Sequence, residues 1–365
     1  MKPADYLNTA NTSALGFGAM RLPDDAETTK MVDAYLASGY NYIDTAYIYG
    51  GSEERLNRTL VKRHPRDSYV IANKMPPWEV QNFPEDCEKI LKEQMRRTGL
   101  DHFDYYLIHS LDDNREAELE KRGFFQWGAE LKKRGIISHL GFSFHGGAGF
   151  LSRLLEKYKE VEFVQLQQNY MDNLRGPASD WHALAVKHNL PIIVMEPVKG
   201  GSLAKLPAPA EKLFKEYASD RSIASWAMQY AATLQNVTCV LGGMTCISDM
   251  HDNIKTFKDL NPLSAEEKNL LDQVLAEMSK VANIPCTACK YCHDSCPLNI
   301  DIASSFSLYN EVKRGSTEWN STAVYKGIPE GCRADACIKC GACVPLCPQH
   351  IDIPNELDVV AKLFG

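Results

Sequence analysis

The sequence predicts an α/β protein, in which a (β/α)8 TIM barrel is followed by a small, mainly helical domain rich in cysteine. Short β-branched or aromatic runs alternate with longer helical patterns from about Ala14 to Phe257, as in repeated βα units around a parallel sheet. Eight such units in about 250 residues is the usual size of a TIM barrel. Nine of the 12 cysteines fall between Cys286 and Cys347, which sets the last part of the chain apart.

Eight apolar runs are expected to be the barrel strands. They are Leu15–Met20, Tyr40–Ala46, Tyr69–Lys74, Phe103–His109, Ile137–Phe144, Phe163–Asn169, Ile192–Pro197 and Val237–Gly242. Helical patterns follow the runs, for example at Thr28–Ser38, Glu53–Lys62, Pro84–Thr98 and Phe124–Arg134. An open doubly wound sheet is the alternative. It would normally carry a glycine-rich fingerprint after its first strand, and the segment from Gly16 to Met20 does not extend into one.

The domain boundary is expected between residues 283 and 284, giving a barrel domain of residues 1–283 and a second domain of residues 284–365. A helix predicted at Ala265–Val281 has apolar residues at helical spacing and is expected to pack on the barrel. In the second domain, a helix at Ala303–Lys313 and a looser segment at Gly315–Gly331 separate two groups of cysteines.

These cysteines form two runs of identical spacing, each ending in Cys-Pro: Cys286, Cys289, Cys292 and Cys296, then Cys337, Cys340, Cys343 and Cys347. This spacing is that of bacterial ferredoxins with two [4Fe–4S] clusters, in which the fourth cysteine of each run ligates the other cluster. We therefore expect cluster I on Cys286, Cys289, Cys292 and Cys347, and cluster II on Cys337, Cys340, Cys343 and Cys296. Tetrahedral zinc is the weaker alternative. Cys332 has no place among eight ligands and is expected to be a free thiol.

Composition and charge exclude other classes of function. A net charge of −7 argues against a nucleic-acid partner, which would favour a basic face. The sequence shows no apolar run of the roughly 20 residues that a membrane span needs, and no charged N-terminal region leading into an apolar stretch. Cysteines concentrated in ligand-like runs favour a reducing compartment, so we expect a cytoplasmic protein with no membrane partner.

Polar residues occur where the predicted strands end, which is the end of a barrel that carries active sites. Asp44 ends the second strand, Tyr49 follows in its loop, Lys74 ends the third strand and His109 ends the fourth. Each alone could be a helix cap, a rim residue or a core residue. Together, the segments Ile43–Gly50, Asn73–Pro76 and Tyr106–His109 closely resemble the catalytic motifs of the aldo/keto reductase family, and this resemblance covers roughly residues 10 to 260. With the cysteine runs, it indicates a subgroup that has a C-terminal ferredoxin-type domain with two [4Fe–4S] clusters.

The resemblance implies that Tyr49 is the general acid that protonates a carbonyl oxygen as hydride arrives from a nicotinamide. A phenol is too weak an acid at neutral pH unless a nearby ammonium favours its ionised form. Lys74 is placed to be that ammonium and Asp44 to pair with it, while His109 would orient the carbonyl.

The family binds NAD(P)H, and the resemblance implies contacts to it from two glycine-containing loops, where backbone N–H groups can approach phosphates closely. The implied contacts are Ser143, Gln165, Gly200, Gly201, Gly242, Gly243, Met244 and Asn253. Gln165 matches the glutamine that binds the nicotinamide amide, and Asn253 matches the asparagine that contacts adenine.

Four positions depart from the family pattern. Phe144 replaces an amide-binding asparagine, Met195 a tyrosine that stacks on the nicotinamide, and Glu196 a serine. Asp249 stands where an arginine often binds the 2′-phosphate. A carboxylate there would repel a phosphate, so we expect NAD(H) in preference to NADP(H).

Three functions remain open at this point. The first is an NAD(P)-dependent oxidoreductase acting on a small carbonyl or alcohol, with candidate substrate contacts at Arg21, Trp78, Phe144, His145 and Tyr170. The second arises because clusters carry single electrons whereas a nicotinamide delivers a hydride, so a flavin or a radical-tolerant substrate would link the barrel to the clusters and to a ferredoxin-like partner. In the third, the clusters are structural staples or a redox sensor.

Overall fold

A computed structural model describes residues 12–281, 283–313 and 318–364. By its internal contacts the chain divides into two compact units. The first consists of the chain up to Pro197 together with Ser225–Leu263, and the second of Val198–Ala224 together with the chain from Ser264 onward. The cysteine-rich region thus shares its unit with a segment that lies between two barrel strands in the sequence.

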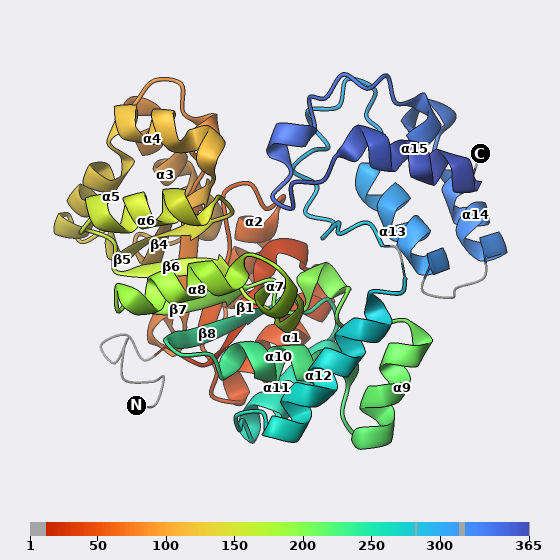
Figure 1. The fold of residues 1–365 in the computed structure, drawn as a ribbon. Coiled ribbons are helices and arrows are strands. Elements are labelled where there is room, and N and C mark those ends of the chain that lie inside the picture. The colour runs from red at the N-terminus through yellow and green to blue at the C-terminus, as the bar shows by residue number, and fades with distance from the viewer. Residues whose placement is uncertain (1–11, 282, 314–317, 365) are drawn as a thin grey trace. The chain divides into compact units, whose positions relative to one another are not determined.

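The first unit contains a closed barrel of eight parallel strands in chain order (Figure 1). The strands are β1 (Leu15–Gly18), β2 (Tyr42–Asp44), β3 (Val70–Met75), β4 (Phe103–Leu111), β5 (Ile137–Phe144), β6 (Phe163–Gln167), β7 (Ile192–Met195) and β8 (Val237–Gly242). Each predicted run overlaps one strand, so the predicted barrel is confirmed. The largest difference is in β2, which has only three residues because the chain turns into the loop of Tyr49 directly after Asp44.

Helices alternate with these strands along the chain. They are α1 (Asp25–Ala37), α2 (Ser52–Leu56), α3 (Glu85–Thr98), α4 (Glu116–Arg122), α5 (Phe124–Lys133), α6 (Ala148–Lys157), α7 (Tyr170–Arg175), α8 (Ala178–Lys187), α10 (Ile223–Ala232) and α11 (Ile247–Lys258). The helix predicted at Glu53–Lys62 is divided, because α2 continues as a π-helical turn over Asn57–Val61. No helix of the described residues is long and apolar enough to cross a membrane.

The interior of the barrel is filled by alternate residues of the strands. A buried apolar cluster joins Tyr42, Val70, Ala72, Tyr105, Leu107, Phe163, Ile193, Cys239 and Leu241. Side chains alternate between the two faces of a strand. The next inward position after this cluster is therefore Asp44 on β2, Lys74 on β3, His109 on β4 and Gln165 on β6. Polar side chains thus follow the apolar interior at the carboxyl ends of four strands.

The second unit is mainly helical, as predicted. It contains α9 (Ala208–Tyr217), α12 (Ala265–Met278), α13 (Ile302–Lys313), α14 (Glu318–Gly327) and α15 (Ile353–Phe364). The expectation of a looser segment at 315–331 is wrong for residues 318–327, which form α14, while residues 315–317 lie outside the described residues. Tyr325 explains the difference, because its ring stacks on Phe364 of α15 with centroids 4.7 Å apart. Tertiary packing thus stabilises a helix that has weak local periodicity.

The core of the cysteine-rich region is apolar. Ile300, Ile302 and Phe306 are packed with Ile351, Ile353 and Leu357 in a buried cluster that also contains Cys292 and Cys343. Asn310 of α13 binds the backbone of Ile284, just before the first cysteine run. Its Nδ2 donates to the carbonyl of Ile284 at 2.7 Å, and its Oδ1 accepts from the N–H of Ile284 at 2.8 Å.

We predict that Gly141→Ala lowers the thermal unfolding midpoint of the holoprotein, with a destabilisation of about 1–3 kcal/mol. A Cβ at Gly141 would lie 2.6 Å from the backbone oxygen of Phe163 on the neighbouring strand. Gly149→Ala in α6 is the control, because its nearest neighbour, Nη1 of Arg153, is 3.7 Å away. Equal midpoints for the two variants would contradict this description of the barrel interior.

Candidate functional site

Lys74 and Asp44 form a buried ion pair at the carboxyl ends of β3 and β2. Nζ of Lys74 donates to Oδ1 of Asp44 at 2.5 Å and to the carbonyl of Thr45 at 2.8 Å. The other carboxylate oxygen of Asp44 accepts from Nε2 of Gln165 at 2.9 Å. Lys74 is fully buried. Burial lowers the pKa of its ammonium, and Asp44 opposes that shift by stabilising the charged form.

Tyr49 and His109 complete this cluster of four side chains. Nζ of Lys74 lies 4.9 Å from the centroid of the Tyr49 ring. The rings of Tyr49 and His109 meet edge to face, with centroids 5.9 Å apart and an interplanar angle of 80°. Burial holds the pKa of His109 well below its usual value, and the charge of Lys74 adds to that effect. The imidazole is therefore neutral near pH 7.

The loop that carries Tyr49 is held by hydrogen bonds on both sides. The N–H of Tyr49 donates to the carbonyl of Ala46 at 3.0 Å, and its carbonyl accepts from the N–H of Ser52 at 2.8 Å. The buried hydroxyl of Ser52 donates to the carbonyl of Ala19 at 2.8 Å and lies 2.8 Å from the hydroxyl of Thr45. The short strand β2 is thereby tied to the start of α2, which fixes the intervening tyrosine.

A buried polar network behind β3 positions Lys74, and the sequence did not reveal it. Nε2 of Gln94 donates to the carbonyl of Lys74 at 2.8 Å and to Oδ1 of Asn73 at 2.9 Å. Oε1 of Gln94 accepts from the hydroxyl of Tyr106 at 2.6 Å, and Nδ2 of Asn73 donates to Glu53 at 2.7 Å. Buried polar groups need such partners. The only signal in the sequence was a glutamine among the apolar positions of α3.

Two of the predicted substrate contacts, Trp78 and Phe144, differ in their surroundings. The ring of Trp78, which is 38% exposed, lies 5.4 Å from that of His109. The guanidinium carbon of Arg115 stands 4.8 Å from the centre of the Trp78 ring, and this arginine was not among the predicted residues. Phe144, in contrast, is fully buried beside other rings, 6.0 Å from that of Trp181. Phe144 is therefore a packing residue and not a substrate contact.

Arg21, His145 and Tyr170 differ in their exposure. Arg21, which follows β1, is exposed. His145 is buried, and its backbone N–H donates to the carbonyl of Leu111 at 2.8 Å. Tyr170 is fully buried, and burial raises the pKa of its phenol. A fully buried side chain cannot touch a ligand in this conformation, so Tyr170 is also a packing residue here.

The residues predicted to contact a dinucleotide belong to both units. The hydroxyl of Ser143 accepts from the N–H of Ser110 at 2.7 Å, and Gln165 is bonded to Asp44 as described. In the first unit, a Cβ at Gly242 would lie 2.8 Å from Nδ2 of Asn253, whereas Gly243 has open space around it. Met244 is buried. The other predicted glycines, Gly200 and Gly201, belong to the second unit.

Two carboxylates lie at the N-terminus of α11. Oε1 of Glu27 accepts from the N–H of Ile247 at 2.8 Å, and Oδ2 of Asp249 accepts from the N–H of Thr245 at 3.1 Å. The bond from Ile247 is the main cause that lowers the pKa of Glu27. Glu27 comes from α1, distant in sequence, and the sequence did not single it out. A helix N-terminus attracts anions, and at α11 these two side chains already occupy it.

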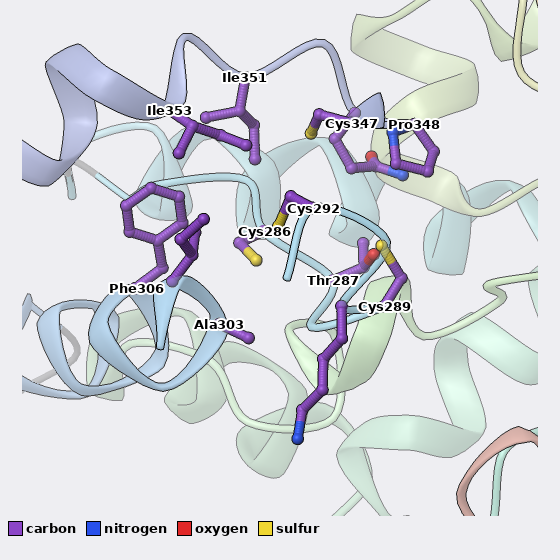
Figure 2. Close-up of a pocket in the computed structure, with 13 residues that line it drawn as sticks. Cys286, Thr287, Cys289, Cys292, Ala303, Phe306, Cys347, Pro348, Ile351 and Ile353 are labelled. Carbon is purple, nitrogen blue, oxygen red and sulfur yellow. The ribbon is translucent and has the colours of Figure 1, made fainter. Parts of the chain in front are cut away.

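The eight predicted cysteine ligands line two cavities in the second unit. Cavity I is lined by Cys286, Cys289, Cys292 and Cys347, which Figure 2 shows gathered around one space. Cavity II is lined by Cys296, Cys337, Cys340 and Cys343. Each has an empty volume of about 330 Å³, including space open to solvent. The structure therefore brings the cysteines together in the crossed sets that their spacing predicts.

The two cysteine runs repeat each other in backbone conformation. Ala288 and Lys339 both have positive φ, of 55° and 57°. Their N–H groups donate to Sγ of Cys286 and of Cys337, each at 3.4 Å. The left-handed region is uncommon for residues with a side chain, so its recurrence at equivalent positions indicates a shared requirement. Hydrogen bonds to sulfur are also one of the means by which proteins tune iron–sulfur clusters.

Four cysteine thiols at each cavity match the donor set that a [4Fe–4S] cluster takes. In the described part of the chain, no three His, Cys, Asp or Glu side chains are arranged to hold one metal ion. Zinc would require its sulfur ligands about 2.3 Å from a single point, whereas the cysteines of a [4Fe–4S] cluster bind different irons. Burial, followed by the neighbouring Cys289, Cys286 and Cys347, raises the pKa of the Cys292 thiol to about 12. Cys332 lines neither cavity.

Comparison with known proteins agrees with this architecture. Residues 14–276 match the model of the aldo/keto reductase family, and residues 285–351 match the model of the 4Fe-4S dicluster domain. The uncharacterized oxidoreductase YqkF of Bacillus subtilis is 23% identical over 278 residues, which cover 67% of this chain and 86% of that protein. An aldo-keto reductase of Mycolicibacterium vanbaalenii is 28% identical over 241 residues, covering 64% of this chain and 80% of the relative.

Solved structures share the barrel. The holo form of aldo-keto reductase AKR11C1 from Bacillus halodurans superposes with a TM-score of 0.60 at 24% identity, covering 72% of this chain and 92% of that one. An aldo-keto reductase from Klebsiella pneumoniae in complex with NADPH gives 0.59 at 20% identity, covering 72% and 91%. At these levels of sequence identity, the similarity to the solved structures shows a shared fold only. The match of the family model over most of the chain shows more: this chain belongs to the aldo/keto reductase family, as an oxidoreductase whose barrel is followed by a 4Fe-4S dicluster domain.

Proposed function

We propose that the protein is an NAD(P)-dependent oxidoreductase that interconverts a small carbonyl compound and its alcohol, with Tyr49 as the general acid and base. The observation that carries the proposal is the position of the Lys74 ammonium, which is 2.5 Å from Asp44 and 4.9 Å from the centre of the Tyr49 ring. Burial strengthens the electrostatic effect of this charge on the phenol. The Klebsiella pneumoniae relative was solved with NADPH, which supports a nicotinamide cofactor here.

The four side chains divide the chemistry among them. A bound nicotinamide would supply the hydride to the carbonyl carbon. Tyr49 gives its proton to the carbonyl oxygen, and the nearby Lys74 stabilises the phenolate that remains. Asp44 keeps Lys74 charged and in place. The neutral imidazole of His109 can donate a hydrogen bond that orients the carbonyl, and Trp78 is placed to form a wall of the substrate site.

The preferred cofactor is proposed to be NAD(H). Glu27 and Asp249 place two carboxylates at the N-terminus of α11, and the family resemblance implies that the 2′-phosphate of NADP(H) would bind near Asp249. A 2′-phosphate there would meet like charges at short range.

The C-terminal domain, which we place at residues 284–365, is proposed to hold two [4Fe–4S] clusters. Cluster I would occupy cavity I and cluster II would occupy cavity II, each bound by the four cysteines that line it. The fourth cysteine of each run lines the cavity of the other run, which supports crossed ligation.

A second candidate function is one-electron transfer between the clusters and a ferredoxin-like partner, with a flavin or a radical-tolerant substrate at the barrel. The observation in its favour is that Cys340 of cavity II is exposed and that Ile338 beside it is 65% exposed. A flavin in the anaerobically purified protein, or a change in cluster oxidation state during turnover, would favour this function over the first.

Replacing Tyr49 by Phe removes the proposed acid while keeping its ring. We expect turnover of carbonyl substrates with NADH to fall about 100-fold or more, while the cluster absorbance stays unchanged. Tyr47→Phe is the matched control, because the Tyr47 ring packs under the guanidinium of Arg97 at 4.5 Å and has no proposed catalytic part. Turnover of the Tyr49 variant at the level of the control would refute the assignment.

Replacing Asp44 by Asn removes the negative charge that opposes the lowering of the Lys74 pKa by burial. The pKa of Lys74, already lowered by burial, should fall further. Lys74 would then lose its charge at a lower pH. As the pH is raised, kcat/KM for carbonyl reduction should begin to fall at a lower pH in Asp44→Asn than in the unmodified protein. If kcat/KM falls at the same pH in both proteins, the charge of Lys74 does not control carbonyl reduction.

The double variant Glu27→Gln, Asp249→Asn should accept NADPH better. We expect kcat/KM for NADPH to rise about tenfold, because the repulsion between these carboxylates and the 2′-phosphate is removed, with kcat/KM for NADH little changed. Asp259→Asn, which removes a charge at the opposite end of α11, is the control. An unchanged ratio of NADPH to NADH activity in the double variant would rule out these carboxylates as the basis of selectivity.

A further inference from the structure

The two cysteine runs and the helices that follow them repeat each other position by position. Helices α13 and α15 begin and end at equivalent places after the two runs. Positive φ recurs as well, at Lys290 (65°) and Gly341 (76°), and at Asn299 (51°) and His350 (53°). Because the backbones are alike, a difference between side chains at equivalent positions is a difference between cavity I and cavity II.

The linings of the two cavities differ in polarity at three equivalent positions. Around cavity I these positions are Thr287, Lys290 and Gln349, and around cavity II they are Ile338, Gly341 and Leu298. Cavity I therefore has a positive charge and two side chains that can donate hydrogen bonds. The lining of cavity II consists of cysteine, glycine, proline, leucine and isoleucine only.

Lys290 occupies its position at a cost to the backbone. Its φ of 65° lies in the left-handed region, which glycine adopts without strain, and the equivalent residue of the second run is Gly341. Strain that persists at one residue points to a use for its side chain. Here the strained residue is the one that brings an ammonium group to the lining of cavity I.

Thr287 and Gln349 are placed to donate hydrogen bonds at cavity I. Thr287 is buried, and Figure 2 shows it among the cysteines of this cavity. Nζ of Lys199 donates to Oε1 of Gln349 at 3.5 Å. An ammonium group cannot accept a hydrogen bond, so the oxygen of this amide faces Lys199 and the NH2 group forms its other branch. Hydrogen bonds to sulfur are one determinant of cluster potential.

Other charges near the two runs do not reverse this difference. Lys339 of the second run is paired with Asp358, and Asp294 of the first run is exposed. Neither Lys339 nor Asp294 lines a cavity. Asp301 and Asp352 occupy equivalent positions after the two runs, so their charges act alike on both cavities.

Solvent exposure acts in the opposite direction but at one sulfur only. Cys340 of cavity II is exposed, whereas the equivalent Cys289 of cavity I is half-buried. Water stabilises the more negative, reduced form of a cluster and so raises its potential. The remaining cysteines of the two sets match in burial, pair by pair. A unit charge and two donors at cavity I outweigh the extra exposure of one ligand at cavity II.

We propose that Lys290, Thr287 and Gln349 hold the reduction potential of cluster I above that of cluster II. This inference rests on the proposed function, from which it takes the two clusters. One electron from an external one-electron donor adds a negative charge to a cluster without making or breaking a bond, and these side chains stabilise that charge at cavity I. Ile302 lines both cavities, so the clusters are neighbours. An electron that enters at the exposed Cys340 therefore moves on to cluster I.

The test is a redox titration of the anaerobically purified full-length protein, followed by electron paramagnetic resonance. Two neighbouring clusters titrate in two steps even when they are identical, because the first electron repels the second, so variants are needed. Lys290→Gln should lower the higher potential by about 59 mV, a tenfold change in the equilibrium constant for moving one electron between the clusters. Lys290→Arg should keep the higher potential, and the lower potential is the internal control.

Gly341→Lys is the converse variant. A Cβ at Gly341 meets no atom within 4 Å, and Lys290 shows that lysine fits the equivalent backbone conformation. This variant should raise the lower potential, whereas Gly341→Gln, which introduces the same strain without the charge, should not. Thr287→Val removes one donor and should lower the higher potential by less than Lys290→Gln does.

Iron and sulfide analysis of the same samples separates this inference from the cluster assignment. Fewer than two clusters, or zinc in the cysteine sites, would overturn the assignment and the inference with it. Two clusters whose potentials are both unchanged in Lys290→Gln, or a fall of the lower potential in that variant, would overturn the inference alone. A fall of the higher potential in Lys290→Gln, together with a rise of the lower one in Gly341→Lys, supports it.

Discussion

The site depends on one buried charge. Lys74 is fully buried at the end of a barrel strand, where an isolated ammonium would be strongly destabilised. Asp44 supplies the opposite charge, the carbonyl of Thr45 accepts a second hydrogen bond from the ammonium, and Gln165 donates to the other oxygen of Asp44. A buried ion pair seldom adds net stability compared with apolar residues of similar size. The role proposed for Lys74 beside Tyr49 accounts for the presence of the pair at this position.

The barrel makes this arrangement possible because its strands present side chains to the interior at every second residue. Apolar residues such as Ala72 and Leu107 fill the interior, and the next inward residues, Lys74 and His109, stand where packing gives way to the loops. The short strand β2 and the hydrogen-bonded turns that follow it then determine the position of the loop residue Tyr49. The polar network of Asn73 and Gln94 fixes the backbone that carries the lysine.

The sequence predicted those parts of the structure that local pattern controls. The eight strand runs and the repeated cysteine spacing are local features, and the strands and the grouping of the cysteines around two cavities follow them. Contacts between distant segments could not be predicted in this way. Glu27 approaches α11 from α1, Gly200 meets Thr287, and α14 depends on the stacking of Tyr325 against Phe364. Phe144 was misjudged because its position in the sequence does not reveal that its ring faces Trp181.

The proposed function puts two kinds of redox chemistry in one chain: hydride and proton transfer at the barrel site, and one-electron clusters in the two cavities. Whether the barrel transfers its electrons as a hydride is the central question. It is tested most directly by a single turnover with NADH deuterated at the transferable position of the nicotinamide, in the anaerobic holoprotein with oxidised clusters. Direct transfer predicts deuterium on the former carbonyl carbon of the product and an unchanged cluster spectrum. Loss of the deuterium to solvent together with reduction of the clusters would contradict it.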